Sequence, residues 1–255
     1  MSLQQTLAVV LQVTDHGDAD KIVTCYSENL GKLSGIAKGA KRSKKRFVNK
    51  LEPFSLLDLS YEESRTSSLM RIDQAELVSA YPTLRNHYNR YTAATLLCEQ
   101  MLQWTREHDA DPDLFSLLRW ALTSLEQGQP AFATVILFEI RMLDLLGYKP
   151  NLSGCLRCGH LTPARRPYFF STSRSGLICK ACNRETEHGQ VPVSLETARL
   201  LHAAQHMAGN KLDRLHFSPD AIRESLTLLR RYDHHLLQRE INSWPHFLAT
   251  LPMAG

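Results

Sequence analysis

Two Cys-x-x-Cys pairs constrain this chain more than any other feature of its sequence. Cys155 and Cys158 form the first pair, Cys179 and Cys182 form the second, and twenty residues separate the pairs. Structural zinc sites hold the ion in a tetrahedron of four cysteine or histidine ligands, and this spacing is typical of such sites. Disulfides are the alternative, because four cysteines allow three pairings. We expect one structural zinc ion on the four thiolates, which leaves His160 without a ligand role.

The other cysteines and the N-terminus favour a reducing compartment. Cys25 lies in an apolar strand-like pattern and Cys98 in a helical one, so we expect both to be small buried side chains. The N-terminal segment lacks the basic start and long apolar core of a signal peptide. No stretch approaches the roughly 20 apolar residues of a membrane span. We therefore expect a cytoplasmic protein with no membrane partner, where thiols stay reduced and paired cysteines bind metal.

Basic residues are concentrated in one short run. The net charge is only +4, yet the run from residue 32 to residue 50 has eight basic residues and no acidic one. Such clustering is typical of contact with nucleic-acid phosphates, although a solvated loop or a nuclear targeting signal can look the same. The run consists of Lys32, Lys38, Lys41, Arg42, Lys44, Lys45, Arg46 and Lys50.

Short apolar segments separated by polar turns predict a β-barrel over residues 1–80. Five strands in a segment of this size match an OB-type barrel, a fold that commonly binds single strands. The basic run would then fill the loop between the third and fourth strands, and the polar turn at residues 15–20 would be a solvated hairpin. The predicted strands cover residues 7–13, 21–26, 33–37, 54–61 and 69–75.

The rest of the chain predicts helices interrupted by the cysteine module. Apolar residues recur every three or four positions in helices at 84–104, from Asp111-Pro112, from Pro130 to Gly147, at 195–208 and at 219–237. Between the cysteine pairs, residues 168–170 and 177–178 predict a hairpin, so the module has the pattern of a zinc ribbon. We therefore predict an α+β multidomain chain, with the barrel at 1–80, a helical bundle at 81–150 and 191–255, and the four-cysteine zinc ribbon at 151–190.

Motifs for catalysis are missing from the sequence. There is no phosphate-binding glycine loop, no Gly-x-Ser-x-Gly elbow and no acidic constellation for two metals. The neighbouring His234 and His235 would point to different faces of a helix, which favours a surface role. The sequence thus predicts a binding protein with no catalytic residues rather than an enzyme.

The order of barrel, basic loop, helices and ribbon is similar to that of the bacterial recombination mediator RecO, zinc-ribbon subset. The resemblance rests on four short motifs: Gly31-Lys32, the run Ile36-Ala-Lys-Gly-Ala-Lys-Arg-Ser-Lys44, Leu51-Glu-Pro-Phe54, and Leu145-Leu-Gly-Tyr148 before the first cysteine pair. The resemblance implies a nucleoid-associated protein of recombinational repair that binds single- and double-stranded DNA. It also implies annealing of strands coated by single-strand binding protein (SSB), without nucleotide hydrolysis. Its partners would be RecR, the acidic C-terminal tail of SSB and, indirectly, RecA.

The same resemblance assigns part of the basic run to DNA. By motif match, Lys38, Lys41, Arg42 and Lys44 lie where the family places DNA-contacting residues, whereas charge alone adds Lys45, Arg46 and Lys50. The barrel is poor in aromatic residues that could stack on bases, so we expect binding through phosphates with little sequence preference. Without the resemblance, three alternatives remain: a zinc-ribbon factor of transcription or ribosome assembly, a metal-dependent hydrolase, and a protein scaffold.

Overall fold

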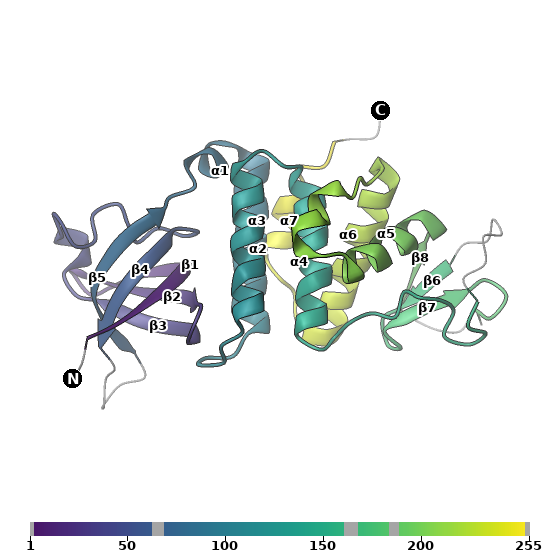
Figure 1. Ribbon diagram of the computed structural model, residues 1–255, viewed down its shortest axis with the longest axis horizontal. Coiled ribbons are helices and arrows are strands. Elements are labelled where there is room, and N and C mark those ends of the chain that lie inside the picture. Colours follow the sequence, from purple (N-terminus) through teal and green to yellow (C-terminus); the bar gives the residue numbers. More distant parts are fainter. Residues whose placement is uncertain (1–2, 63–68, 161–167, 184–188, 253–255) are drawn as a thin grey trace. The chain divides into compact units, whose positions relative to one another are not determined.

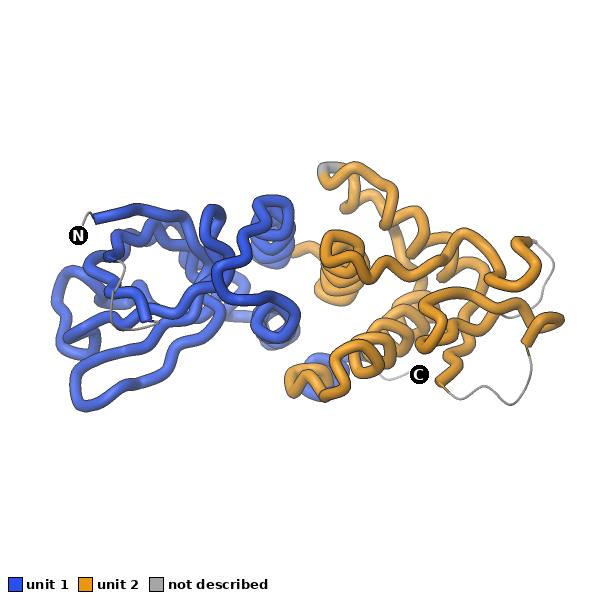
Figure 2. The backbone as a smooth tube through the Cα atoms, turned by 90° about the horizontal axis from the view of Figure 1, so that it is seen from below, with its two compact units in different colours: residues 1–127, 245–255 blue, residues 128–244 orange. Residues whose placement is uncertain are grey.

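The computed structural model describes residues 3–62, 69–160, 168–183 and 189–252. Backbone contacts divide the chain into two compact units, one of residues 1–127 with 245–255 and the other of residues 128–244 (Figure 2). We refer to them as unit 1 and unit 2 and describe each by itself. The finer division into segments at 1–80, 81–150, 151–190 and 191–255 remains a prediction.

Unit 1 begins with the predicted five-stranded barrel, which the structure confirms (Figure 1). The strands close in the order β1-β2-β3-β5-β4, and only the β3–β5 pair among these neighbours is parallel. Gly35 makes this pairing possible, since a Cβ there would lie 2.7 Å from Cγ1 of Ile72. The strands are β1 (Gln4–His16), β2 (Asp20–Ser27), β3 (Gly31–Ala37), β4 (Leu56–Glu62) and β5 (Met70–Ser79).

Residues at alternate positions of the strands are buried in the barrel interior. In β3 the buried positions are Gly31, Leu33, Gly35 and Ala37, and the residues between them are half-buried. Cys25 is fully buried in this core, as its sequence pattern predicted, and burial raises the pKa of its thiol to about 12. The barrel is therefore a packed core whose outer surface is left for ligands.

Three helices follow the barrel in unit 1. They are α1 (Pro82–Asn86), α2 (Tyr88–Trp104) and α3 (Pro112–Glu126), which pack on one another, with α2 also against β1. The single helix predicted up to residue 104 is interrupted at His87, whose extended backbone (φ −118°, ψ 114°) ends α1. Asp111 caps α3 as predicted, because its Oδ1 accepts the amides of Asp113 at 2.9 Å and Leu114 at 3.0 Å.

Unit 2 combines helices with a small sheet. Helices α4 (Ala131–Leu145), α5 (Leu195–His206) and α6 (Pro219–Leu237) pack on one another, and ten of the fifteen residues of α4 are buried. Pro130 precedes α4 as its N-cap rather than opening it as first residue. A short 3-10 helix, η2 (Gly209–Arg214), follows α5. The last helix, α7 (Ser243–Leu248), begins at the end of unit 2, and its residues from Pro245 on are assigned to unit 1.

The sheet of unit 2 has one strand more than predicted. The expected hairpin is β6 (Tyr168–Ser171) with β7 (Gly176–Cys179), and β8 (Gln190–Val193) pairs with the other edge of β6. Sequence patterns treated Val191-Pro192 only as the start of the next helix. Pro192 is tolerated because β8 is an edge strand, where a missing amide breaks no ladder. In the described part of the chain, no helix is long and apolar enough to cross a membrane.

Candidate nucleic-acid interface and metal centre

The connection between β3 and β4 carries the basic run, as predicted, and two apolar anchors hold it on the barrel. Phe47 and Leu51 are 3% and 2% exposed and belong to the barrel's hydrophobic core. The amide of Phe47 donates to Oγ of Ser43 at 3.1 Å, which tightens the turn before the anchor. A short 3-10 helix, η1 (Ala40–Arg42), begins after Gly39, whose φ of 69° favours glycine. We call residues 38–50 the basic loop.

Acidic groups around the loop fix three of its cations. Nζ of Lys41 lies 3.1 Å from Oδ2 of Asp15 and donates to the Gly17 carbonyl at 2.9 Å. Arg46 lies 3.6 Å from Asp73, and Lys50 lies 3.1 Å from Glu76. These partners come from the β1–β2 hairpin and from β5, far away in sequence. Sequence reasoning treated residues 15–20 as a solvated hairpin and gave them no role in positioning the loop.

The same hairpin also holds the loop backbone. Oδ1 of Asp20 accepts the amide of Gly39 at 2.8 Å, and the carbonyl of Ala19 accepts the amide of Lys41 at 2.9 Å. The start of the basic loop is therefore fixed to the β1–β2 hairpin by side chain and main chain. A phosphate-binding surface gains from such pre-organisation, because fewer backbone torsions must be ordered on binding.

Four cations of the loop point into solvent without a partner. Lys38, Arg42, Lys44 and Lys45 are exposed, and within the described residues no carboxylate or carbonyl is bonded to their side chains. A cation that is already paired must give up that partner before it binds a phosphate. The four unpaired cations are thus the strongest candidates for phosphate contact among the seven predicted residues.

Lys32, the first cation of the basic run, has a structural position instead. Its Nζ donates to the carbonyl of Leu102 at 2.8 Å and to that of Thr105. Both carbonyls belong to the C-terminal end of α2, where a positive charge is favourable. Lys32 therefore joins β3 to α2 within unit 1 and is not a candidate for DNA contact.

The four predicted cysteine ligands meet in unit 2 at one point. Their sulfur atoms all lie within 4.8 Å of one another, and Sγ of Cys158 lies 3.9 Å from Sγ of Cys179. A tetrahedron with Zn–S bonds of about 2.3 Å has edges of roughly 3.8 Å. No further group of three or more potential ligands gathers within the described ranges, and His160 lies outside this one. The four cysteines could bind one metal ion.

Backbone amides prepare one of these sulfurs for a cation. The amides of Cys179 and Arg157 donate to Sγ of Cys155 at 3.3 Å and 3.5 Å. Burial is the largest influence and raises the pKa of the Cys155 thiol, but these amides and that of Cys158 together lower it to about 6. Hydrogen bonds to the sulfurs of Cys179 and Cys158 raise the pKa of the Cys182 thiol to about 12. A bound cation would replace the protons that the four sulfurs otherwise share.

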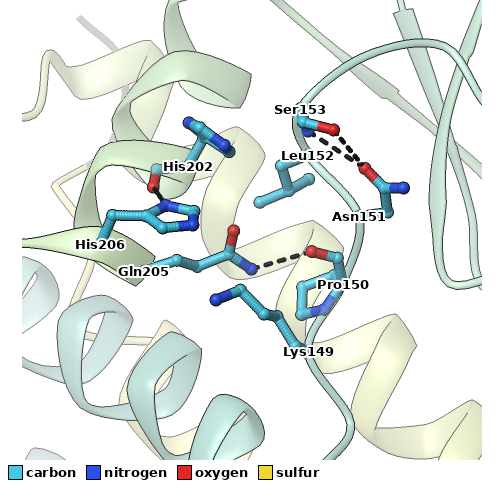
Figure 3. Close-up of a pocket in the computed structure, with 8 residues that line it drawn as sticks. All are labelled: Lys149, Pro150, Asn151, Leu152, Ser153, His202, Gln205 and His206. Carbon is cyan, nitrogen blue, oxygen red and sulfur yellow. Dashed lines mark hydrogen bonds between the residues drawn. The ribbon is translucent and has the colours of Figure 1, made fainter. Parts of the chain in front are cut away.

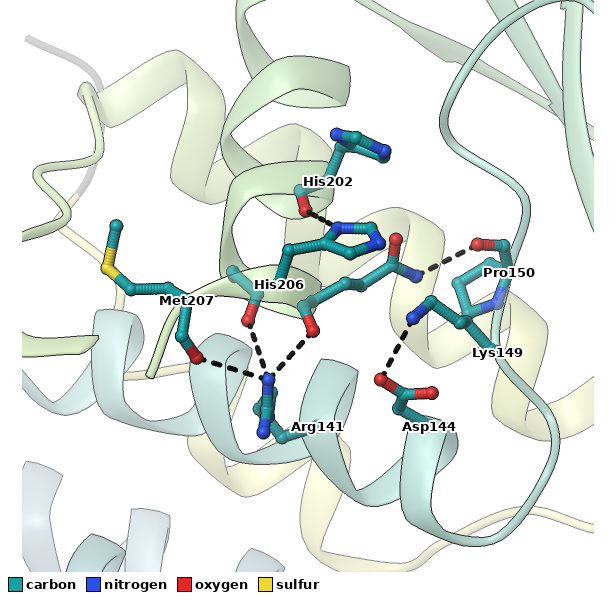
Figure 4. A network of polar contacts seen from close by, with 9 residues as sticks. Arg141, Asp144, Lys149, Pro150, His202, His206 and Met207 are labelled. Carbon is teal, nitrogen blue, oxygen red and sulfur yellow. Dashed lines mark hydrogen bonds and ion pairs between the residues drawn. The ribbon is translucent and has the colours of Figure 1, made fainter. Parts of the chain in front are cut away.

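A pocket of about 320 Å³ lies elsewhere in unit 2, between residues 149–153, which lead into the cysteine module, and α5 (Figure 3). Its polar groups are largely occupied: Gln205 donates to the Pro150 carbonyl at 2.9 Å, and Nδ1 of His206 is hydrogen-bonded to the His202 carbonyl at 2.8 Å. Next to the pocket, Arg141 donates to the Gln205 and Met207 carbonyls at the end of α5, and the lining residue Lys149 pairs with Asp144 (Figure 4). The contacts of Lys149 and Pro150 hold the segment that leads into the cysteine module against α4 and α5. None of the predicted site residues lines the pocket.

Comparison with known proteins decides the family. A family model described as Recombination protein O N terminal matches residues 1–81, and one described as Recombination protein O C terminal matches residues 85–245. The chain belongs to the RecO family. Its RecO relatives include a DNA repair protein RecO of Syntrophus aciditrophicus, 34% identical over 94% of this chain and 93% of the relative. Those of Geobacter metallireducens (34% identical, 95% and 96% covered) and Myxococcus xanthus (32%, 92% and 93%) carry the same name.

RecO membership confirms the resemblance seen in the sequence and supports a role in recombinational DNA repair. It also favours that role over a factor of transcription or ribosome assembly. The N-terminal match covers the barrel with its basic loop, and the C-terminal match includes the cysteine cluster. Both candidate sites therefore lie within RecO segments rather than in additions to them.

Proposed function

We propose that this RecO-family protein binds single- and double-stranded DNA through the basic loop and anneals complementary strands coated by SSB. The observation that carries the proposal is the set of unpaired, exposed cations on a pre-organised loop, namely Lys38, Arg42, Lys44 and Lys45. Lys41, Arg46 and Lys50 belong to the same surface, but each is paired with a carboxylate and therefore contributes less positive potential than an unpaired cation. DNA would be held through its phosphates, with little preference for sequence.

Annealing follows from charge neutralisation. Two complementary strands repel each other through their phosphates, and a cationic surface that holds the backbones lowers this repulsion while the bases stay free to pair. The step requires no bond to be broken in a nucleotide, so the protein acts as a non-enzymatic mediator. We further propose that it works with RecR in the bacterial cytoplasm, at the nucleoid, to load RecA.

For the cysteine cluster we propose one structural zinc ion. Four thiolates complete the tetrahedron and leave no open position for a substrate or water, which is the arrangement of structural rather than catalytic zinc. The ion would tie the turn at Cys155 and Cys158 to the end of β7. The helical segments would receive the acidic C-terminal tail of SSB.

A strand-annealing assay tests the proposal. Two complementary fluorescent oligonucleotides are coated with SSB and mixed with the protein in the absence of ATP. The proposal predicts faster pairing, lost at high salt because phosphate contacts are screened. Binding of DNA without faster pairing would contradict the mediator role, and tighter binding to structured RNA than to DNA would favour a factor of another pathway.

A further inference from the structure

The barrel has no exposed aromatic residue in its described part for a base to stack on. The four aromatic side chains that lie near the loop or core in sequence, Tyr26, Phe47, Phe54 and Tyr61, are all buried, with at most 4% exposed. Single-strand binding proteins usually combine a cationic track with aromatic stacking. If this protein uses stacking at all, the aromatic surface has to lie outside the barrel strands.

Large exposed aromatic residues are rare in the described part of the chain, and two of them share one turn of α2. Tyr88 is 67% exposed and Tyr91 42% exposed, and their spacing of three residues places both on one face of the helix. The third, Tyr148, lies in unit 2. We call Tyr88 and Tyr91 the tyrosine platform; it lies at the start of α2, the helix labelled in Figure 1.

The tyrosine platform is attached to the same connection that carries the basic loop. The ring of Tyr91 meets the ring of Phe54 edge to face, with centroids 5.3 Å apart. The guanidinium of Arg85 lies 5.4 Å from the Phe54 centroid and donates to the Pro53 carbonyl. Phe54 follows Lys50 by only four residues, so their Cα atoms are at most about 14 Å apart. The platform and the C-terminal end of the basic loop therefore belong to one unit and are connected through Phe54, whereas the four unpaired cations come nine or more residues before Phe54.

The chemistry of the platform suits bases rather than phosphates. Arg85 is committed to main-chain carbonyls of residues 53 and 80, and Arg90 is close enough to Glu126 to lower the pKa of that carboxyl. Residues 85–91 expose the two phenol rings together with the polar side chains of Asn86, His87 and Asn89, and they include no acidic residue. A strand held by its phosphates at the basic loop could lay bases further along its length on these rings.

From this arrangement we infer that the tyrosine platform stacks bases of single-stranded DNA that continues from the basic loop. The inference deepens the proposed function and rests on it. A base stacked on an aromatic ring contributes roughly 1–3 kcal/mol, which corresponds to about 5-fold to 150-fold in affinity. Because stacking involves no ion, its loss leaves the salt dependence of binding unchanged.

The test compares a thymidine oligonucleotide with an abasic oligonucleotide of the same length, by fluorescence anisotropy at several salt concentrations. Tyr88→Ala is the main variant, because Tyr91 also packs on Phe54 and its removal disturbs the junction. We expect Tyr88→Ala to weaken thymidine binding by about 5-fold or more, to leave abasic binding and the salt slope unchanged, and to be rescued by Tyr88→Trp. Tyr148→Ala, which removes an exposed tyrosine in unit 2, serves as the matched control and should bind like the wild type.

Two results would overturn the inference. If Tyr88→Ala binds thymidine as the wild type does, while Lys44→Glu with Lys45→Glu loses affinity, the platform is wrong and the basic-loop proposal stands. If Tyr88→Ala weakens both oligonucleotides equally with an unchanged melting temperature, the residue does not act through bases. Failure of the wild-type protein to bind either oligonucleotide would overturn the proposed function itself.

Discussion

Lys32 in the barrel donates from Nζ to the carbonyl of Leu102, 2.8 Å away at the C-terminal end of α2. A single lysine thus links β3 to a helix seventy residues later in the chain. The contact shows that membership of the basic run does not decide function, since the geometry removes Lys32 from the DNA-binding candidates.

Lys32→Met should destabilise unit 1 without changing DNA affinity much. Two carbonyls would lose a charged donor, and hydrogen bonds to charged groups contribute about 1.5–3 kcal/mol. Urea unfolding measures the change. Lys44→Met is the control, because an exposed side chain without a partner should alter stability by less than about 0.5 kcal/mol. Equal destabilisation by the two variants would contradict the role assigned to Lys32.

Glu126 should make the stability of unit 1 depend on pH. Its carboxylate, at the end of α3, accepts the amides of Thr83 at 3.0 Å and Leu84 at 2.7 Å, so one helix caps the start of another. Burial alone would raise the pKa of Glu126, but these amides and Arg90 lower it below the ordinary 4.5. The stabilisation is therefore complete above pH 4.5 and is lost as the pH falls through the lowered pKa.

The corresponding variant is Glu126→Gln. We expect it to lose about 0.5–2 kcal/mol at pH 7, as other helix caps do, and to approach the wild type in acid, where both side chains are neutral. Thermal melts across this pH range measure the difference. Glu107→Gln, at an exposed position in the same unit, should show no such trend. A difference that grows on acidification would contradict the capping role.

The cysteine cluster should hold one zinc ion per chain. Metal analysis of freshly reduced protein should find it, and acid should release it because protons compete for the thiolates. Cys155→Ser should lose the metal and expose unit 2 to proteolysis more than the barrel. Cys98→Ala replaces a buried cysteine on α2, far from the cluster in sequence, and should keep the metal. Reduced protein without metal would refute the zinc proposal.

Sequence reasoning predicted features that depend on local patterns. Alternating and helical periodicity located the five barrel strands and helices α3 to α6, and the spacing of the cysteine pairs identified the residues whose sulfurs meet. An element that buries one face has a periodic apolar pattern within its own residues, so it can be recognised without knowledge of its neighbours. The interruption at His87 was missed because apolar spacing continues through it, and β8 was missed because four residues containing a proline carry little strand signal.

Contacts between segments that are distant in the sequence were not predicted. Nothing in the run of basic residues distinguishes Lys41 and Lys50, which are paired, from Lys44 and Lys45, which are not. Their partners come from the first hairpin and from β5, and only the closed barrel brings them to the loop. The assignment of all seven cations to DNA remains a prediction, with the unpaired four as its core.

The salt dependence of single-stranded DNA binding tests the central claim most directly. Lys44→Glu with Lys45→Glu is compared with Arg199→Glu with Lys211→Glu, which makes the same charge change at exposed positions of unit 2. Each lost phosphate contact lowers the slope of log affinity against log salt by about 0.7, so the loop variant should lose roughly 1.4 while the control keeps the wild-type slope. Equal slopes for loop variant and wild type would show that DNA does not bind at the basic loop.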